Sequence, residues 1–169
     1  MVQFDKLQAE LALNQALDRQ LDTLVRRANE TVLILGADRG RLKENQLRNV
    51  VNVAGNTDSI EALLNFIRYQ IAREKAWQIK STGPKDFGHQ VIADIQNDVR
   101  AAAQRAAQTV RNEIGETAPA EDLLFGEAYL RLAEQYLGYL NRAFYYCEKT
   151  DNGYRQLAEM LKEATSAGA

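Results

Sequence analysis

Apolar residues recur along this chain at the three- and four-residue spacing of helices, and the pattern predicts an all-α fold. The first helix is expected over about residues 4–29, where leucines line one side. The run TVLILG is interpreted as a buried turn of helix ending at Gly36, because a lone strand would have no partner. Further helices are expected over about 42–54, 58–80, 85–114, 120–149 and 154–164. The predicted architecture is an irregular bundle of about five to six helices, in a single domain spanning residues 1–169.

The helix expected over 58–80 has two different faces when its residues are placed at 100° intervals. One face is aliphatic and is expected to contact the core: Ile60, Leu63, Leu64, Ile67 and Ile71. The second lies about 100° round from the first and mixes aromatic with polar and basic residues: Phe66, Tyr69, Gln70, Arg73, Trp77 and Lys80. Arg68 and Lys75 fall together on the far flank.

The mixed face has two interpretations. Its aromatic residues could be buried against a neighbouring helix while the arginines extend to solvent. Alternatively, aromatic and cationic side chains together could form a surface that holds RNA. We expect Trp77 to be buried and the arginines to contact RNA under either interpretation of the aromatic residues.

The helix expected over 42–54 repeats this arrangement, with polar and basic residues opposite its Val/Leu stripe. Asparagine beside arginine can bond phosphate oxygens and ribose hydroxyls without reading the base sequence. The candidate RNA-binding residues from the two helices and their flanks are Arg41, Lys43, Asn45, Arg48, Asn52, Arg68, Arg73 and Lys80.

Charge is distributed unevenly. The 169-residue chain has a net charge of −2, with 46% hydrophobic and 26% charged residues, which is ordinary for a globular protein. Residues 39–85, however, hold nine basic side chains against four acidic ones. A basic segment within an acidic protein is consistent either with a nucleic-acid surface or with a solvated helix face.

Motifs for catalysis and cofactor binding are missing from the sequence. One histidine and one cysteine cannot supply the ligands of a zinc finger or a di-iron bundle, and no glycine-rich phosphate loop occurs. Cys147 lies among aromatic residues and is expected in the core, although a Cys147–His89 dyad stays open. We therefore expect a non-enzymatic protein without cofactor or metal. The lone cysteine, the lack of a signal peptide and the lack of a long apolar run predict a cytoplasmic location without membrane contact.

Three segments resemble the small helical subunit of type III (Csm-type) CRISPR effector complexes. RLKENQLRNVVN places Gln46-Leu47-Arg48 at that family's first helical motif, and LLNFIRYQIAREKAW places Tyr69 and Arg73 at its second. The aromatic-rich stretch Phe125–Tyr146 is similar to the family's late helix. The resemblance covers roughly 41–80 and 123–149.

The resemblance implies a non-catalytic subunit, several copies of which stack along a guide-RNA ribonucleoprotein. Such a subunit would touch the backbone of the guide RNA–target RNA duplex, and a neighbouring subunit would cut the target. Its partners would be both RNAs, the other effector subunits and further copies of itself. We expect self-association to be head-to-tail, through the Ala-rich part of 86–122 or the C-terminal helix. The alternative is a helical protein–protein adaptor or regulatory bundle with no RNA role.

Overall fold

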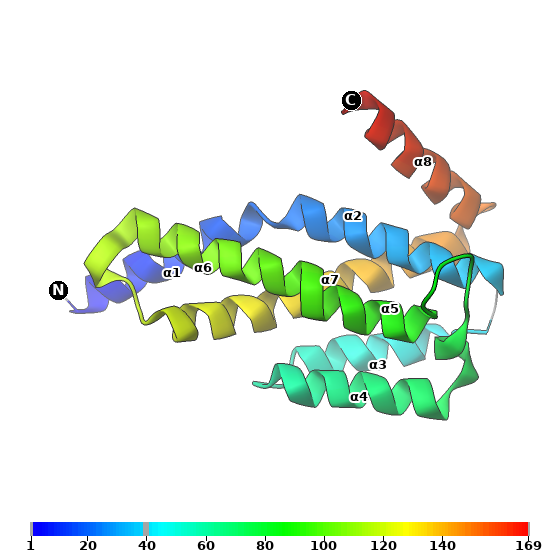
Figure 1. Ribbon diagram of the computed structural model, residues 1–169, viewed down its shortest axis with the longest axis horizontal. Coiled ribbons are helices and arrows are strands. Elements are labelled where there is room, and N and C mark those ends of the chain that lie inside the picture. The colour runs from blue at the N-terminus through cyan, green and yellow to red at the C-terminus, as the bar shows by residue number, and fades with distance from the viewer. Residues whose placement is uncertain (1, 39–40, 169) are drawn as a thin grey trace.

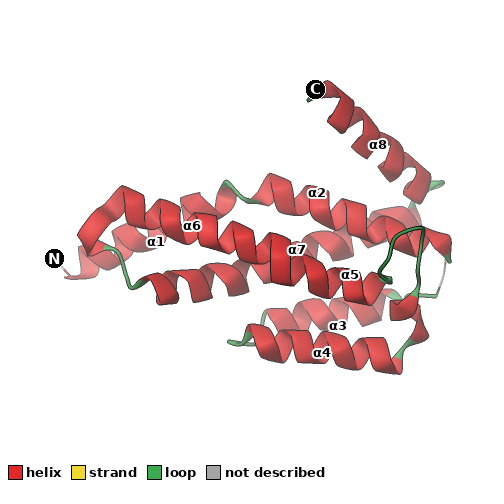
Figure 2. Ribbon diagram, viewed as in Figure 1, coloured by secondary structure: helices red, strands yellow, loops and turns green. Residues whose placement is uncertain are grey.

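The chain folds almost entirely into helices in a computed structural model, which describes residues 2–38 and 41–168 and their side chains from residue 5 (Figure 2). Within this part of the chain, the α-helices are α1 Val2–Asp18, α2 Leu21–Val32, α3 Glu44–Ala54, α4 Ile60–Arg73, α5 Phe87–Asp94, α6 Arg100–Ile114, α7 Glu121–Lys149 and α8 Gly153–Ala167. The prediction of an all-α fold is confirmed. The predicted number of about five to six helices was too low.

The helices form an elongated bundle around α7, the longest of them (Figure 1). Helices α1 and α6 pack together, and α2, α3 and α6 each pack along α7. The hairpin of α3 and α4 lies along one side of the bundle, and α8 projects from the opposite side (Figure 1). The buried apolar side chains join into one hydrophobic cluster that α1 to α8 all supply. Burial of this apolar surface is the main favourable contribution to folding.

The first predicted helix is divided into α1 and α2 by a turn at residues 19–20. No glycine or proline marks this turn, but the Gln20 amide donates to the Leu17 carbonyl at 2.8 Å, which tightens the end of α1. The division lets the two helices pack differently, since α1 lies mainly against α6 and α2 mainly against α7. The predicted helical turn ending at Gly36 is a 3₁₀ helix, Leu33–Ala37.

The helix predicted to reach Lys80 ends at Arg73 instead, because Glu74 is extended with φ −122° and ψ 110°. A 3₁₀ turn, Lys75–Gln78, then carries Trp77 into the core, where its ring lies 5.3 Å from the ring of Phe87. The Gln78 side chain donates to the Ile71 carbonyl at 2.7 Å and satisfies one of the last backbone acceptors of α4. Helix α4 therefore ends, and Trp77 enters the core, without glycine or proline at the turn, while Gly83 and Pro84 lie later in the connection to α5.

Helices α5 and α6 form one continuous rod, since the segment between them, Ile95–Val99, is a π-helical turn. The alanines of α6 are turned toward the bundle: Ala102, Ala103, Ala106 and Ala107 are buried. Small side chains permit the close approach of α6 to α1 and α7. These alanines are therefore unavailable for self-association, and the predicted head-to-tail contact would have to use the exposed face of α6 or α8.

Candidate nucleic-acid interface

Helix α3 presents a polar face to solvent. Its apolar residues Leu47, Val50 and Ala54 are buried, and this fixes the opposite face outward. The exposed side chains of this helix and of the segment leading into it include Arg41, Lys43, Asn45, Arg48 and Asn52. All five candidate residues in this region therefore lie where an RNA backbone could reach them.

A short connection makes α3 and α4 antiparallel neighbours, so the first turn of α3 lies at the same end as the last turn of α4 (Figure 1). Ser59 begins α4 by accepting a hydrogen bond from the Ala62 amide at 3.2 Å. Four residues of the predicted core stripe of α4 are buried in the hydrophobic cluster, Leu63, Leu64, Ile67 and Ile71, while Ile60 is partly buried and packs against it. The exposed side chains of α4 outside this stripe are therefore available to contact a ligand.

The three aromatic residues of the mixed face differ in their exposure to solvent. Trp77 is 0% exposed, as predicted, and its indole Nε1 has no hydrogen-bond partner among the described residues. Phe66 is half-buried and lies 6.2 Å from Tyr69, centroid to centroid. Tyr69 is 52% exposed. Only Tyr69 therefore offers its ring to solvent.

Tyr69 and Arg73 form an exposed pair one helical turn apart on α4. The Arg73 guanidinium donates to the Tyr69 hydroxyl at 3.2 Å, and its carbon lies 5.9 Å from the ring centroid. The contact is a cation–π arrangement in which both side chains remain accessible. Because the pair occupies the flank of α4 on the Phe66 side, it is separate from the core stripe.

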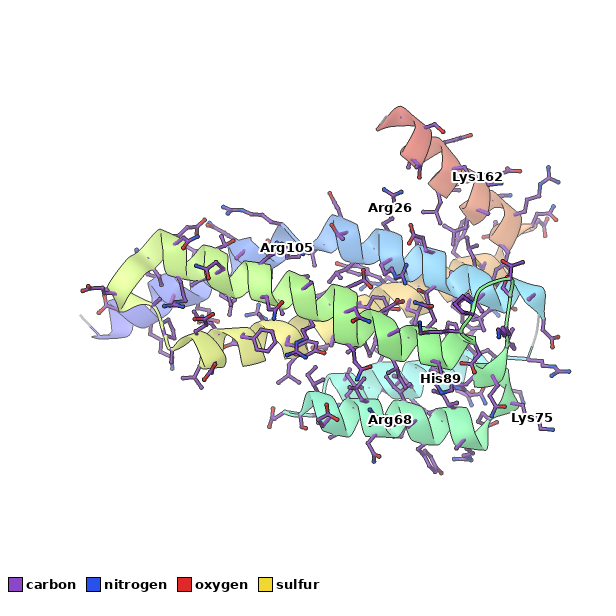
Figure 3. The ribbon with its side chains drawn as sticks, viewed as in Figure 1. Arg26, Arg68, Lys75, His89, Arg105 and Lys162 are labelled. Atoms are coloured by element: carbon purple, nitrogen blue, oxygen red, sulfur yellow. The ribbon has the colours of Figure 1, made fainter. Side chains whose placement is uncertain are left out.

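Two of the predicted residues lie apart from this surface. Arg68 is about 140° round α4 from Arg73 and reaches toward Glu61, 4.0 Å away (Figure 3). Lys80 lies beyond the end of α4, in an extended segment that forms an isolated antiparallel bridge with Asp86. The prediction that Trp77 and Lys80 continue the mixed stripe was wrong, because that helical register stops at Arg73. Gln70, placed on the same stripe, is buried instead.

Each of the three arginines Arg41, Arg48 and Arg73 has a carboxylate nearby. The distances are 3.0 Å for Arg41–Asp38, 3.8 Å for Arg48–Glu44 and 3.4 Å for Arg73–Glu74. All three arginine side chains are more than half exposed, so these ion pairs contribute little to stability. They do reduce the positive potential of the free surface, and a phosphate would have to compete with them.

A second exposed pair, which the sequence analysis missed, lies on α7. The Lys149 ammonium is 5.7 Å from the ring centroid of Tyr145 and 2.8 Å from the Glu44 carboxylate on α3. The hydrogen bond from Lys149 to Glu44, together with the charge of Glu44, raises the pKa of Lys149 above its ordinary value. The Tyr-x-x-x-Lys spacing repeats the Tyr69–Arg73 spacing and could have indicated the pair, but residue 149 lies outside the basic segment.

A buried carboxylate was also missed. Asp94 is 0% exposed and accepts hydrogen bonds from four side chains on three helices: Arg27 at 2.7 Å, Thr31 at 2.5 Å, Gln90 at 2.7 Å and Tyr136 at 2.6 Å. Burial, followed by the negative charge of Asp94, holds the pKa of Tyr136 well above its ordinary value. Burial acts to lower the pKa of Arg27, yet the charge of Asp94 raises it overall. The network joins α2, α5 and α7 inside the bundle and is therefore a structural link between them.

His89 and Cys147 have different surroundings. The exposed His89 ring nitrogen Nδ1 lies 2.8 Å from Asp86, the residue that also caps α5. Cys147 is buried, and burial, followed by the charge of Glu148, raises the pKa of its thiol to about 11. At neutral pH the sulfur is therefore the unreactive thiol. Among the described residues, no group of three or more His, Cys, Asp or Glu side chains is arranged to hold a metal ion.

In the part of the chain that the structure describes, none of the helices is both long enough and apolar enough to cross a bilayer. Comparison of the chain with protein-family models, with curated proteins and with solved structures finds no match in any of the three.

Proposed function

We propose that this protein is a non-catalytic small subunit of a type III CRISPR ribonucleoprotein effector and contacts RNA through the outer face of α3 and the adjoining flank of α4. The observation that supports the proposal is the exposed row of arginine and asparagine side chains on α3, with the exposed Tyr69–Arg73 pair beside its first half. Such side chains can bond phosphates and ribose hydroxyls of any sequence.

The proposed contact is weak for one isolated subunit. The net charge of −2 and the carboxylates beside the arginines oppose binding to a polyanion. In an array, several such subunits would engage one RNA together, and the effective concentration of each contact would rise. The proposed partners are the guide RNA, the target RNA, other effector subunits and further copies of the chain arranged head-to-tail.

In this proposal the protein works in the cytoplasm and needs no cofactor. It positions the guide–target duplex through backbone contacts, while base pairing reads the sequence and a neighbouring subunit cuts the target. Arg41, Lys43, Asn45, Arg48, Asn52 and Arg73 are the residues proposed to contact RNA. Arg68 and Lys80 would contribute only where the RNA also passes the other flank of α4.

The experiment that tests the proposal is purification of the protein in its native complex, followed by nuclease-protected sequencing of any bound RNA. A short RNA of defined size is expected in molar proportion to the complex. An Arg48→Ala, Arg73→Ala double variant should assemble and yet capture less target RNA. A native complex free of RNA would refute the proposed function.

The alternative, a protein–protein adaptor, is favoured by a different surface. Leu7 and Leu11, one helical turn apart on α1, are 65% and 57% exposed, and Leu123 in the first turn of α7 is 70% exposed. Exposed large apolar side chains on a helix face are typical of a protein contact. Substitution of these leucines could abolish assembly of the native complex while the Arg48→Ala and Arg73→Ala substitutions leave RNA binding unchanged. In that case the adaptor would be the better description.

A further inference from the structure

Two tyrosines differ from every other aromatic side chain that the structure describes. Tyr69 and Tyr145 are each 52% exposed, while the remaining described aromatic residues are buried or half-buried. Each tyrosine has a basic residue four positions later, Arg73 or Lys149, whose charge lies 5.9 Å or 5.7 Å from the ring centroid. The same combination of exposed ring and neighbouring cation therefore occurs twice.

The two pairs flank the same part of α3. Lys149 meets Glu44 in the first turn of α3, and a Cβ added at Gly55, just past its last turn, would lie 3.0 Å from Glu134 of α7. Helix α7 thus runs antiparallel to α3, which places Tyr145 beside the first half of α3. The antiparallel hairpin places Tyr69 beside this same half from the other side (Figure 1).

A shallow groove of about 410 Å³ lies between α3 and the end of α7. Its lining includes Lys43, directly before α3, Asn45 of α3 and Lys149 of α7. Glu44 contacts both Lys149 at 2.8 Å and Arg48 at 3.8 Å, so one carboxylate balances a cation on each helix. Positive groups from two helices therefore converge here around Glu44, and the Glu148 carboxylate, which also lines the groove, is a second negative charge that acts on Lys149.

An exposed tyrosine beside a cation suits an unpaired nucleotide better than a duplex. The bases of a duplex are stacked on one another, so a side chain reaches mainly phosphates and sugars. An unpaired base can stack on the ring while its phosphate pairs with the ammonium, as in proteins that bind single-stranded nucleic acids. Helix α3, in contrast, has no aromatic side chain, so its outer face suits contacts with the RNA backbone alone.

We propose that Tyr145 and Lys149 form a binding site for one unpaired RNA nucleotide, with the base on the Tyr145 ring and the phosphate at the Lys149 ammonium. This inference rests on the proposed function and extends it, because the site adds single-stranded RNA, such as an unpaired part of the target, to the duplex contact on α3. When the nucleotide binds, its phosphate replaces the Glu44 carboxylate as the partner of the Lys149 ammonium.

The test measures binding of a fluorescently labelled oligouridine, and of the same strand annealed to oligoadenine, by anisotropy. Tyr145→Ala and Lys149→Gln should each weaken binding of the single strand, about tenfold for Tyr145→Ala, and leave duplex binding unchanged. Tyr145→Phe keeps the ring and should bind like wild type. Arg155→Gln on α8, also an exposed cation paired with a carboxylate, is the matched control and should not change binding.

Arg48→Ala, measured on both RNAs, separates failure of this inference from failure of the proposed function. If Arg48→Ala weakens duplex binding but Tyr145→Ala and Lys149→Gln bind the single strand normally, the nucleotide site is refuted and the proposed function stands. If the wild-type protein in its native complex binds neither RNA, or no variant changes binding by that complex, both proposals are overturned. A defect of Tyr145→Ala in subunit assembly, with normal RNA binding, would assign the tyrosine to a protein contact and refute the site.

Discussion

The Arg27–Asp94 pair in the core and the Arg48–Glu44 pair on α3 join the same two chemical groups in opposite surroundings. Asp94 is fully buried and receives hydrogen bonds from four side chains, so removing it from its partners would leave several donors unpaired. Arg48 and Glu44 lie 3.8 Å apart on an exposed surface, where water can replace either partner. The buried pair therefore stabilises the fold, while the exposed pair can exchange its carboxylate for a phosphate.

The largest effect is expected from Asp94→Ala. The substitution should lower the free energy of unfolding by about 3–5 kcal/mol, because Arg27, Thr31 and Tyr136 would lose their shared acceptor in the core. Urea denaturation measures the loss. Glu44→Gln, at a side chain that is 33% exposed, is the control in the surface pair and should change stability by less than about 1 kcal/mol. Equal, small losses for both variants would remove the distinction between the two regions.

Trp77→Ala should lower the free energy of unfolding by about 3–5 kcal/mol as well, because it leaves a cavity beside Phe87. Tyr69→Ala is the matched control on the exposed part of the mixed face and should leave the melting temperature nearly unchanged. Thermal unfolding followed by circular dichroism compares the two. A stable Trp77→Ala variant that loses RNA would contradict the assignment of the indole to the core.

Arg48→Ala and Arg73→Ala should each weaken RNA binding without unfolding the protein. Removal of one phosphate-binding charge should also flatten the dependence of log affinity on log salt, by a slope of about 0.7 to 0.9. A salt titration of target-RNA capture measures this, and the loss of affinity should be the same for unrelated guide sequences.

Arg105→Ala and Arg111→Ala on α6 are the controls for those variants, since α6 lies away from the α3–α4 surface (Figure 3). The sequence alone placed Lys80 with the contact residues, whereas its position beyond α4 now predicts a smaller effect for Lys80→Ala than for Arg73→Ala. Equal effects from the α6 pair and the α3–α4 pair would refute the RNA surface.

Glu44→Gln should strengthen RNA binding about two- to fivefold, because the substitution frees both Arg48 and Lys149 from their counter-ion. The gain should shrink at high salt, where screening weakens the original ion pairs. Glu159→Gln on α8 removes another carboxylate that pairs with an arginine and should have no such effect. Weaker binding by Glu44→Gln would indicate that Glu44 orders the surface instead of competing with RNA.

The smallest effects are expected from His89→Ala and Cys147→Ser, which should leave target-RNA capture within a few-fold of wild type. With a thiol pKa of about 11, Cys147 should react slowly with iodoacetamide at neutral pH and faster once urea exposes it. Mass spectrometry of the alkylated protein measures both rates. Rapid modification of the folded protein, or a large loss of turnover in an assembled complex, would reopen a catalytic role for this cysteine.

Much of the secondary structure follows from local pattern, as α3 illustrates. Its Leu/Val stripe places Arg48 and the asparagines outward whatever lies on the other side, so their exposure could be predicted. The end of α4 could not, because Glu74 and Lys75 carry no breaking signal and the turn depends on burial of Trp77 against a residue ten positions later. The break between α1 and α2 is similar, since it reflects separate packing partners.

The sequence by itself determined the helical fold class, the aliphatic stripe of α4 and the solvent-facing row on α3, because each depends on helical periodicity within a few turns. Only the tertiary structure decided that Asp94 is buried among donors from three helices and that Tyr145 and Lys149 lie beside Glu44, a hundred positions earlier in the chain. The physical reason is that burial and charge pairing depend on which helices meet, and that choice belongs to the packing of the whole core.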